Sequence, residues 1–258
     1  MLNEIISTIT QAGGQAYYVG GFVRDQILGI NSKDYDLEVF HLDTERLSEL
    51  LMRFGKVDKV GVSFGVIKLK TPDGSDFDFT LPRRENKTGL GHKGFQVEVD
   101  HTMFVEEAAA RRDFTINAIY RCASTGELQD PYQGILDLDK QILRATSSHF
   151  AEDPLRVLRG FQFAARFDLR IDANTATLAK SLVTEYPSLA TERIWSEWQK
   201  WATRSVVPSR GLELLLMSGW IDIYPELTAL RGVPQDPQWH PEGDVWTHTL
   251  FVCDAAVK

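Results

Sequence analysis

The chain has 258 residues, of which 43% are hydrophobic and 25% are charged, and its formal net charge is −8. This length provides a buried core for one large domain or for two smaller ones. Apolar runs stay below the roughly 18 residues of a membrane span, and the N-terminus lacks the features of a signal peptide, so we expect no membrane partner. The negative charge alone argues against a nucleic-acid partner, because lysine and arginine neutralise phosphates, but the clustering of basic residues decides the question.

Two cysteines, Cys122 and Cys253, lie far apart in the sequence. Their spacing matches neither a disulfide framework nor a metal site. We interpret them as reduced thiols of a cytoplasmic protein, since thiols stay reduced in that compartment. The sequence gives no indication of the oligomeric state.

The first part of the chain alternates between helical and strand patterns. A helix is expected over residues 2–12, "AYYVGG" predicts a buried strand that runs into a glycine turn, and "FVRDQILG" predicts a helix ending at Gly29. "DYDLEVF" predicts a second strand, and residues 43–54 predict a helix. "GVIKLKT" and "DFDFTLPR" predict two strands joined by the turn "PDGS". These elements predict an α/β fold with a mixed or mainly antiparallel sheet.

Residues 83–102 are polar and contain glycine, and we expect a loop there. It is either a solvated loop or an arm that binds phosphate, because a loop of this length in a compact domain is more often functional or disordered. Its cationic residues are Arg83, Arg84, Lys87, His92 and Lys93.

The second part of the chain has helical patterns. A helix is expected over residues 104–121, and residues 130–145 predict a turn followed by a short strand. From Asp153 onward four stretches are helical: "DPLRVLRGFQFAARF", "ANTATLAKSLV", "ATERIWSEWQKWATR" and "PSRGLELLLMSGW". The composition changes near residue 150, which predicts three parts: a mixed domain (1–145), a helical domain (146–230) and a short last segment (231–258).

The glycine pair Gly20-Gly21 follows a predicted strand and precedes a predicted helix that contains Arg24. Glycine lets the backbone approach a ligand closely, and a helix N-terminus presents free N–H groups to anions. The pair is therefore either a phosphate-binding turn, with Arg24 as a further nucleotide-binding residue, or a plain turn.

Carboxylates occur at alternate positions of the next predicted strand, at Asp34, Asp36 and Glu38. Alternate residues of a strand point to the same face, so these groups repel one another unless a cation is present. Asp78 lies on a further strand with the same alternation. Carboxylates that converge from two strands suit Mg²⁺, and two such ions would assist attack on a nucleotide triphosphate. The alternative is an acidic strand end that faces solvent.

"YYVGGFVRDQILG" and "KDYDLEVF" resemble the signature of the class II nucleotidyltransferases, which include the CCA-adding enzymes and the bacterial poly(A) polymerases. "RRDFTINAIY", "DPYQGILDL", "EDPLRVLR" and "ERIWSEW" resemble further motifs of that family in the same order, over most of residues 16–200. The resemblance implies a polymerase beta-like head followed by a helical neck. It implies Asp34 and Asp36 as metal ligands, Asp78 as a third carboxylate, and ATP and CTP as substrates.

The stretch "EDPLRVLR" permits an argument from chemistry alone. Asp153, Arg156 and Arg159 are three apart, on one helix face, and a carboxylate beside a guanidinium complements cytosine and adenine but not uracil or guanine. Asp153 also suits the helix N-cap, with Pro154 as first helical residue, and both roles are compatible. The resemblance implies base selection by Asp153 and Arg156, although Gln162 stands where many relatives have another arginine.

Within "RRDFTINA", the resemblance suggests a triphosphate contact for Arg111, for Arg112 or for both, and a ribose contact or a structural bond for Asp113. A helix-end salt bridge is the alternative. Asn117 either binds the ribose or caps a helix, and Lys33 is a candidate phosphate ligand. In the neck we expect an internal ion-pair brace formed by Glu192, Arg193 and Glu197.

We interpret the chain as an enzyme that adds C and A to the 3′ end of tRNA. The alternatives are a poly(A) polymerase, a partial CC-adding or A-adding enzyme, and a catalytically inactive RNA-binding protein. RNA binding predicts a basic stripe, whose members are Arg83, Arg84, Lys87, Lys93, Arg111 and Arg112. The last stretch, "HPEGDVWTHTLFVCDAAVK", resembles the opening of an HD-type domain, but His240 and His248 do not make a complete hydrolase metal site.

Overall fold

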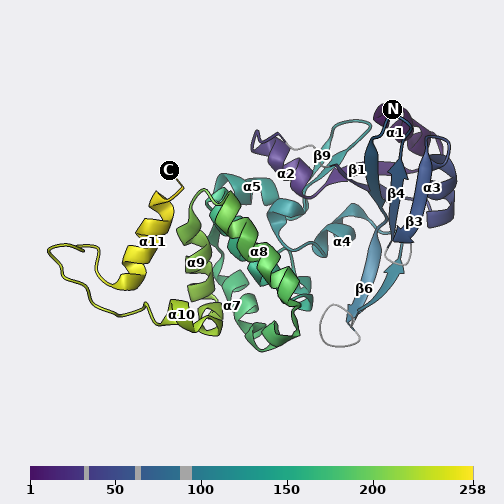
Figure 1. Ribbon diagram of the computed structural model, residues 1–258. Helices are drawn as coiled ribbons and strands as arrows, with labels where there is room; N and C mark the ends of the chain where they lie inside the picture. The colour runs from purple at the N-terminus through teal and green to yellow at the C-terminus, as the bar shows by residue number, and fades with distance from the viewer. Residues whose placement is uncertain (32–34, 62–64, 88–94, 258) are drawn as a thin grey trace. The chain divides into compact units, whose positions relative to one another are not determined.

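The computed structural model describes residues 1–31, 35–61, 65–87 and 95–257 (Figure 1). The chain forms two compact units, one comprising Met1–Gly89 and Gly94–Ile135 and the other comprising Leu136–Lys258. Among the residues that the structure describes, no helix is long and apolar enough to cross a membrane.

The first unit is built on a seven-stranded sheet with the order β3-β4-β5-β2-β1-β8-β9. β2 and β5 are parallel, and the other neighbouring strands in this sheet are antiparallel, which confirms the predicted mixed sheet. The strands are β1 (Gln15–Val19), β2 (Asp36–Phe40), β3 (Lys56–Gly61), β4 (Val66–Lys70), β5 (Asp76–Thr80), β8 (Tyr120–Cys122) and β9 (Leu128–Gln129).

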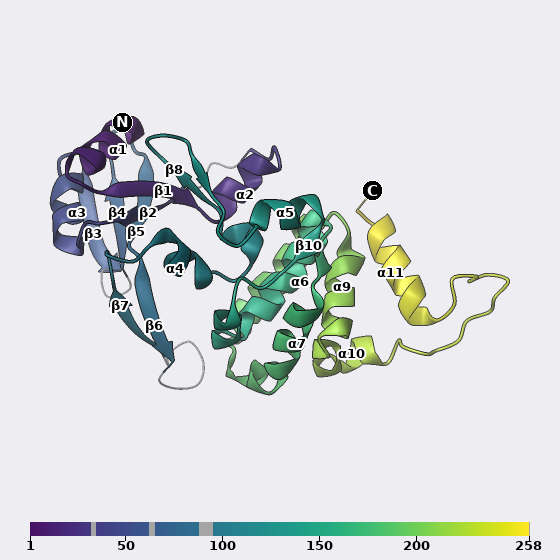
Figure 2. The same cartoon turned by 180° about the vertical axis from the view of Figure 1, so that it is seen from behind.

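One face of this sheet is covered by α1 (Leu2–Gln11) and α3 (Thr44–Leu51), which lie side by side (Figure 2). α1 buries its apolar positions four residues apart, Ile5 and Ile9, as an amphipathic helix does. They pack with apolar residues that point inward from α3 and from the strands: Leu37, Val39, Leu47, Leu51, Ile67, Leu69 and Phe79. This cluster is the core of the unit.

The opposite face of the sheet is apolar over some strands and charged over others. Over β1, β2 and β8 it is apolar and packs with α4 (Val105–Ala110), in a cluster that includes Tyr17, Phe40, Ala109 and Tyr120. Over β3, β4 and β5, alternate residues on this face are charged. They are Lys56, Asp58, Lys68, Lys70, Asp76 and Asp78.

Two sequence-based expectations about this unit were wrong. The predicted loop at 83–102 contains an antiparallel ribbon of β6 (Arg83–Lys87) and β7 (Phe95–Val99), whose alternation of Phe95, Val97 and Val99 with polar residues is a strand pattern. The predicted helix at 104–121 is short, because α4 ends at Ala110 and is followed by a 3-10 turn at Thr115–Asn117 and by β8. Side-chain bonds from Asp113 replace helical bonds there.

The second unit is helical, as predicted. Its helices are α6 (Leu155–Phe167), α7 (Ala173–Ser181), α8 (Thr191–Arg204), α9 (Pro208–Met217), α10 (Pro225–Thr228) and α11 (Val245–Ala255). α6 packs against α8, where Phe161 contacts the rings of Trp198 and Trp201 with centroid distances of 4.5 and 5.3 Å. Between the predicted turn and strand at 130–145, the structure adds α5 (Gly134–Asp139), and the strand itself is β10 (Ile142–Leu143), which pairs in parallel with β11 (Arg170–Ile171).

Candidate nucleotide-binding and catalytic site

Two of the predicted carboxylates are neighbours in the sheet. Asp36 is the first residue of β2, and it is the register partner of Asp78 on the parallel strand β5. Neighbouring strands are about 4.8 Å apart, and paired residues point to the same face, so the two side chains are adjacent. Asp36 is exposed and the Asp78 side chain is 43% exposed, and Lys68 Nζ lies 3.2 Å from Asp78 Oδ2.

This pair fits a magnesium ion in its chemistry. Mg²⁺ prefers hard oxygen ligands and is commonly held by one or two carboxylates together with the phosphates of a substrate. Asp36 and Asp78 offer such oxygens on the charged face of the sheet, where solvent reaches both. Asp34 and Lys33 lie outside the described residues, so their roles stay predictions.

The glycine turn is placed at the end of β1, beside the start of β2. Gly20 has φ of +65°, a conformation that other residues rarely adopt, and it precedes α2 (Gly21–Ile27). A Cβ at position 20 would lie 3.0 Å from Arg112 Nη1. The turn therefore needs glycine both for its backbone conformation and for the close approach of this guanidinium.

Arg24, Asn117 and Asp113, all predicted to bind the nucleotide, form one buried hydrogen-bonded group with Asp25. Arg24 is 3% exposed, its Nη2 lies 2.6 Å from Asp25 Oδ1, and its Nη1 donates to Asn117 Oδ1 at 2.6 Å. Asn117 Nδ2 donates to Asp113 Oδ1 at 3.0 Å. The group joins α2 to the turn at residues 113–117, and its contact with a nucleotide stays a prediction.

The sequence did not show what pairs with Glu38. In the structure Glu38 is 7% exposed, and its Oε2 accepts hydrogen bonds from Arg112 Nη2 at 2.7 Å and from Tyr120 Oη at 3.0 Å. Burial lowers the pKa of Arg112, but the charges and hydrogen bonds of Tyr120 and Glu38 outweigh it and hold that pKa above its ordinary value. Burial raises the pKa of Tyr120. The trio fixes Arg112 beside the glycine turn.

The base-selecting residues belong to the second unit. Asp153 Oδ1 accepts from the backbone N–H of Leu155 at 2.9 Å and so satisfies an N–H group at the start of α6, but the N-cap is Pro154 and not Asp153 as predicted. Arg156 Nη1 donates to His149 O at 2.5 Å, and the Arg159 guanidinium lies 5.3 Å from the centroid of the Phe163 ring. Base selection by Asp153 and Arg156 stays a prediction.

The expected ion-pair brace of the neck has other partners. Arg193 Nη2 lies 3.2 Å from Asp153 Oδ2, so it supports this carboxylate at the start of α6 rather than a glutamate of its own helix. Glu197 is 3% exposed and accepts from Lys200 Nζ at 2.7 Å. The brace predicted for Glu192, Arg193 and Glu197 was therefore wrong, because spacing along one helix cannot show bonds between helices.

The predicted basic stripe is only partly available to a phosphate. Arg84 pairs with Asp100 at 2.9 Å and with Glu107 at 3.8 Å. Arg112 is held by Glu38, and Arg83 and Arg111 are half-buried. The side chain of Lys87 and the whole of Lys93 lie outside the described residues.

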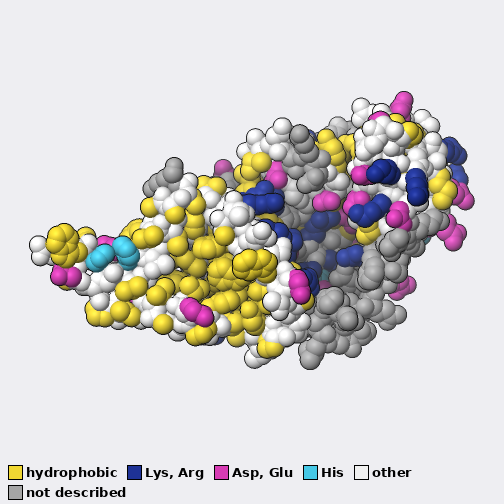
Figure 3. Space-filling model, viewed as in Figure 1, with side chains coloured by type: hydrophobic (Ala, Val, Ile, Leu, Met, Phe, Trp, Pro, Cys, Tyr) yellow, Lys and Arg dark blue, Asp and Glu magenta, His cyan; other side chains and the backbone are white. Residues whose placement is uncertain are grey.

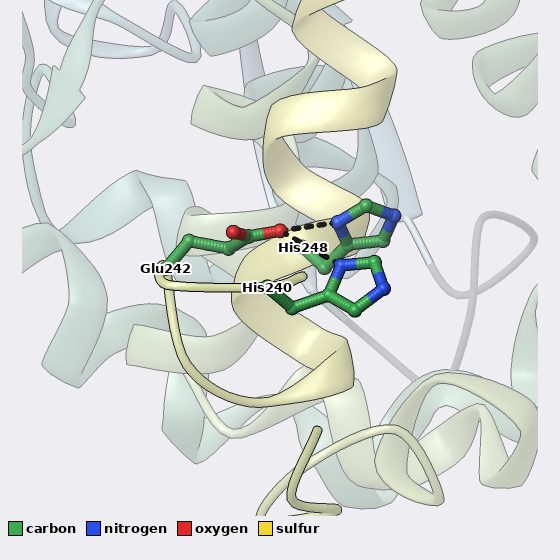
Figure 4. Close-up of side chains that lie close together, drawn as sticks. All are labelled: His240, Glu242 and His248. Carbon is green, nitrogen blue, oxygen red and sulfur yellow. Dashed lines mark hydrogen bonds and ion pairs between the residues drawn. The ribbon is translucent and has the colours of Figure 1, made fainter. Parts of the chain in front are cut away.

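A separate cluster occurs near the end of the second unit, where the carboxylate of Glu242 faces two neighbouring histidines, His240 and His248 (Figure 4). Its Oε1 lies 3.3 Å from His240 Nδ1 and 2.5 Å from His248 Nδ1. A hydrogen bond from its own backbone, followed by the bonds from these histidines, lowers the pKa of Glu242. The sequence analysis named both histidines and missed Glu242, which ties the segment before α11 to that helix.

Comparisons with known proteins show the family of the chain. The family model described as "Poly A polymerase head domain" matches residues 16–144. The "Multifunctional CCA protein" of Vibrio vulnificus (strain CMCP6) is 40% identical over 251 residues, which cover 95% of this chain and 59% of that protein. The protein of the same name from Aliivibrio salmonicida (strain LFI1238) is 41% identical over 249 residues and is covered to 58%. The chain thus spans less than two thirds of the length of these relatives.

The chain is also similar to solved structures of CCA-adding enzymes. A structure described as the apo form II of a CCA-adding enzyme superposes with a TM-score of 0.71 at 26% identity, covering 93% of this chain and 56% of that one. The Bacillus stearothermophilus CCA-adding enzyme in complex with CTP gives 0.67 at 27% identity, covering 83% and 50%. The carboxylate pair and the glycine turn both fall within the range matched by the family model. The chain therefore belongs to the family of the Poly A polymerase head domain.

Proposed function

We propose that the chain carries the nucleotidyl-transfer part of an enzyme that adds C and A to the 3′ end of tRNA. The observation that supports this most strongly is the register pair Asp36 and Asp78, on two strands of a head domain whose relatives are named for CCA addition. The structures similar to this chain include a CTP complex and a complex of the Thermotoga maritima CCA-adding enzyme with tRNA. We place the reaction in the cytoplasm, with the tRNA substrate.

In the proposed reaction the 3′-hydroxyl of the RNA attacks the α-phosphorus of CTP or ATP, and pyrophosphate leaves. Asp34, Asp36 and Asp78 would hold two Mg²⁺ ions. These ions would neutralise the charge that develops on the phosphate oxygens. Catalysis then depends on position, because the site has to align the attacking and leaving oxygens.

The remaining residues bind and orient the nucleotide. Gly20 and Gly21 let the backbone at the end of β1 approach the triphosphate closely, and Lys33 and Arg111 supply cations. Asp113 lies in the buried group that shapes the turn, and we assign the ribose hydroxyl to it and to Asn117. Arg24 holds that group in place.

Base selection is assigned to Asp153 and Arg156, with Arg159 beside them. Asp153 accepts from the amine of cytosine or adenine, while the carbonyl oxygen of uracil or guanine would meet it acceptor against acceptor. The Arg193 side chain, 3.2 Å from Asp153 Oδ2, orients this carboxylate.

Poly(A) addition is the second candidate, because the matching family model is named for it.

The full chain is incubated with Mg²⁺ and with tRNAs that end before CCA, after C and after CC, and each labelled nucleotide is supplied in turn. Addition that completes CCA and stops supports the proposal, and addition of C or of A alone indicates a partial enzyme. Long A tails support the polymerase, and no incorporation by the folded protein contradicts all of them.

A further inference from the structure

The exposed part of the sheet in the first unit carries three lysines that no sequence motif includes. Lys56 on β3 is the register partner of Lys70 on β4, and Lys68 lies two residues before Lys70 on the same face. All three are exposed. Figure 3 shows lysine and arginine side chains gathered over β3 and β4, beside acidic ones. We call Lys56, Lys68 and Lys70 the lysine face.

Within the part of the chain that the structure describes, aspartates lie in register with two of the three lysines: Asp58 and Asp78 with Lys68, and Asp76 with Lys70. Lys68 pairs with Asp78, but neither Lys56 nor Lys70 takes part in an ion pair there. Like charges directly opposite each other on neighbouring strands destabilise a sheet. Placing Lys56 against Lys70 therefore costs stability, and an anion bound between them would remove that cost.

The position of the lysine face relative to the carboxylates indicates which anion binds. In the order β3-β4-β5-β2-β1, Asp78 on β5 and Asp36 on β2 occupy the middle. The glycine turn follows β1, on one side of them, and the lysine face on β3 and β4 lies on the other side. The row Asp58, Lys68, Asp78 and Asp36 is continuous in register, and it spans three strand spacings, about 15 Å.

In phosphoryl transfer the attacking and leaving oxygens lie roughly in line on opposite sides of the phosphorus. With the triphosphate bound at the glycine turn, as proposed above, the leaving pyrophosphate would lie on that side. The attacking hydroxyl then approaches from the other side, which is the side of the lysine face.

We propose that the lysine face binds backbone phosphates of the RNA strand whose 3′ end reaches Asp36 and Asp78. This inference rests on the proposed nucleotidyl transfer. Lys56 and Lys70 contact phosphates, and Lys68 joins the face to the carboxylate pair through Asp78.

The test is RNA binding by the double variant Lys56→Glu/Lys70→Glu. Fluorescence anisotropy with a labelled tRNA acceptor hairpin measures its affinity at several salt concentrations. We expect affinity to fall at least ~10-fold and the slope of log K against log salt to decrease by about two, one for each lost phosphate contact. The KM for CTP should not change, and Lys56→Arg/Lys70→Arg should bind RNA as the wild type does.

The matched control is Arg46→Glu/Arg53→Glu, which changes the net charge equally at two exposed residues of α3 and the turn after it. Unchanged RNA affinity in the lysine variant, or an equal loss in the control, overturns the proposal. The binding assay does not require incorporation. A wild-type chain that binds RNA but adds no nucleotide refutes the proposed function and leaves the lysine face under test, whereas a chain that does neither refutes both.

Discussion

Removal of the buried carboxylate of Glu38 should destabilise the first unit. Its Oε2 accepts hydrogen bonds at 2.7 Å from Arg112 and at 3.0 Å from Tyr120. A hydrogen bond to a charged group contributes ~1.5–3 kcal/mol, and loss of one partner leaves the other charge unpaired. The Arg112 side chain is 25% exposed, so water replaces part of this contribution. We expect Glu38→Ala to lower the free energy of unfolding by about 3 kcal/mol.

Urea denaturation followed by tryptophan fluorescence and circular dichroism measures this loss. The matched control is Glu49→Ala, since Glu49 forms an exposed pair with Arg46 at 3.2 Å and should change stability by less than about 0.5 kcal/mol. A double-mutant cycle with Tyr120→Phe should give a coupling free energy of about 1 kcal/mol. A Glu38→Ala protein within about 0.5 kcal/mol of the wild type would refute the assigned ion pair.

Three further predictions follow from the site. Gly20→Ala should cost about 1–2 kcal/mol from its positive φ and displace Arg112, seen as a lower unfolding midpoint and a raised KM for CTP. Asp36→Asn should abolish nucleotide incorporation and leave the unfolding midpoint unchanged. The control is Asp76→Asn, two residues before Asp78 on β5, which should retain activity. If the Asp36→Asn protein remains active, Asp36 is not part of the site. The raised pKa of Tyr120 keeps its phenol neutral in the folded protein, whereas the phenol of the unfolded chain ionises at pH ~10. The contribution of Tyr120 to the free energy of unfolding is therefore present below that pH and is lost as the pH rises above it. Tyr120→Phe should reduce this alkaline loss of stability.

The sequence predicted the parts of this unit that depend on local pattern. Alternation in "DYDLEVF" and "DFDFT" placed Asp36 and Asp78 on strands, and the structure joins those strands in register. The lysine face was not predicted, since Lys56 and Lys70 meet only through the pairing of β3 with β4. Glu38 was left without a partner for the same reason, because the Arg112 that binds it is distant in sequence.

The errors have a common physical origin. The helix that "EEAAA" begins was predicted to run through residues 111–117, but it ends at Ala110, and the side chains of Asp113 and Asn117 bond to neighbouring groups beyond it. Arg193 was paired within its own helix because spacing shows only one helix at a time, whereas its partner is Asp153. Patterns along the chain predict elements, and the bonds between elements depend on packing that no short window contains.

The parallel pairing of β2 with β5 also affects how the protein folds. α3, β3 and β4 lie between the two strands in the sequence, so Asp36 and Asp78 meet only after the chain has crossed over and closed a long loop. Such non-local pairing is slow, because the entropy of loop closure is lost before the contacts form. A slip of β5 by one residue would turn Asp78 toward the core. The carboxylate pair is therefore complete only once the sheet has closed in the right register, and the onset of activity would report late steps of refolding.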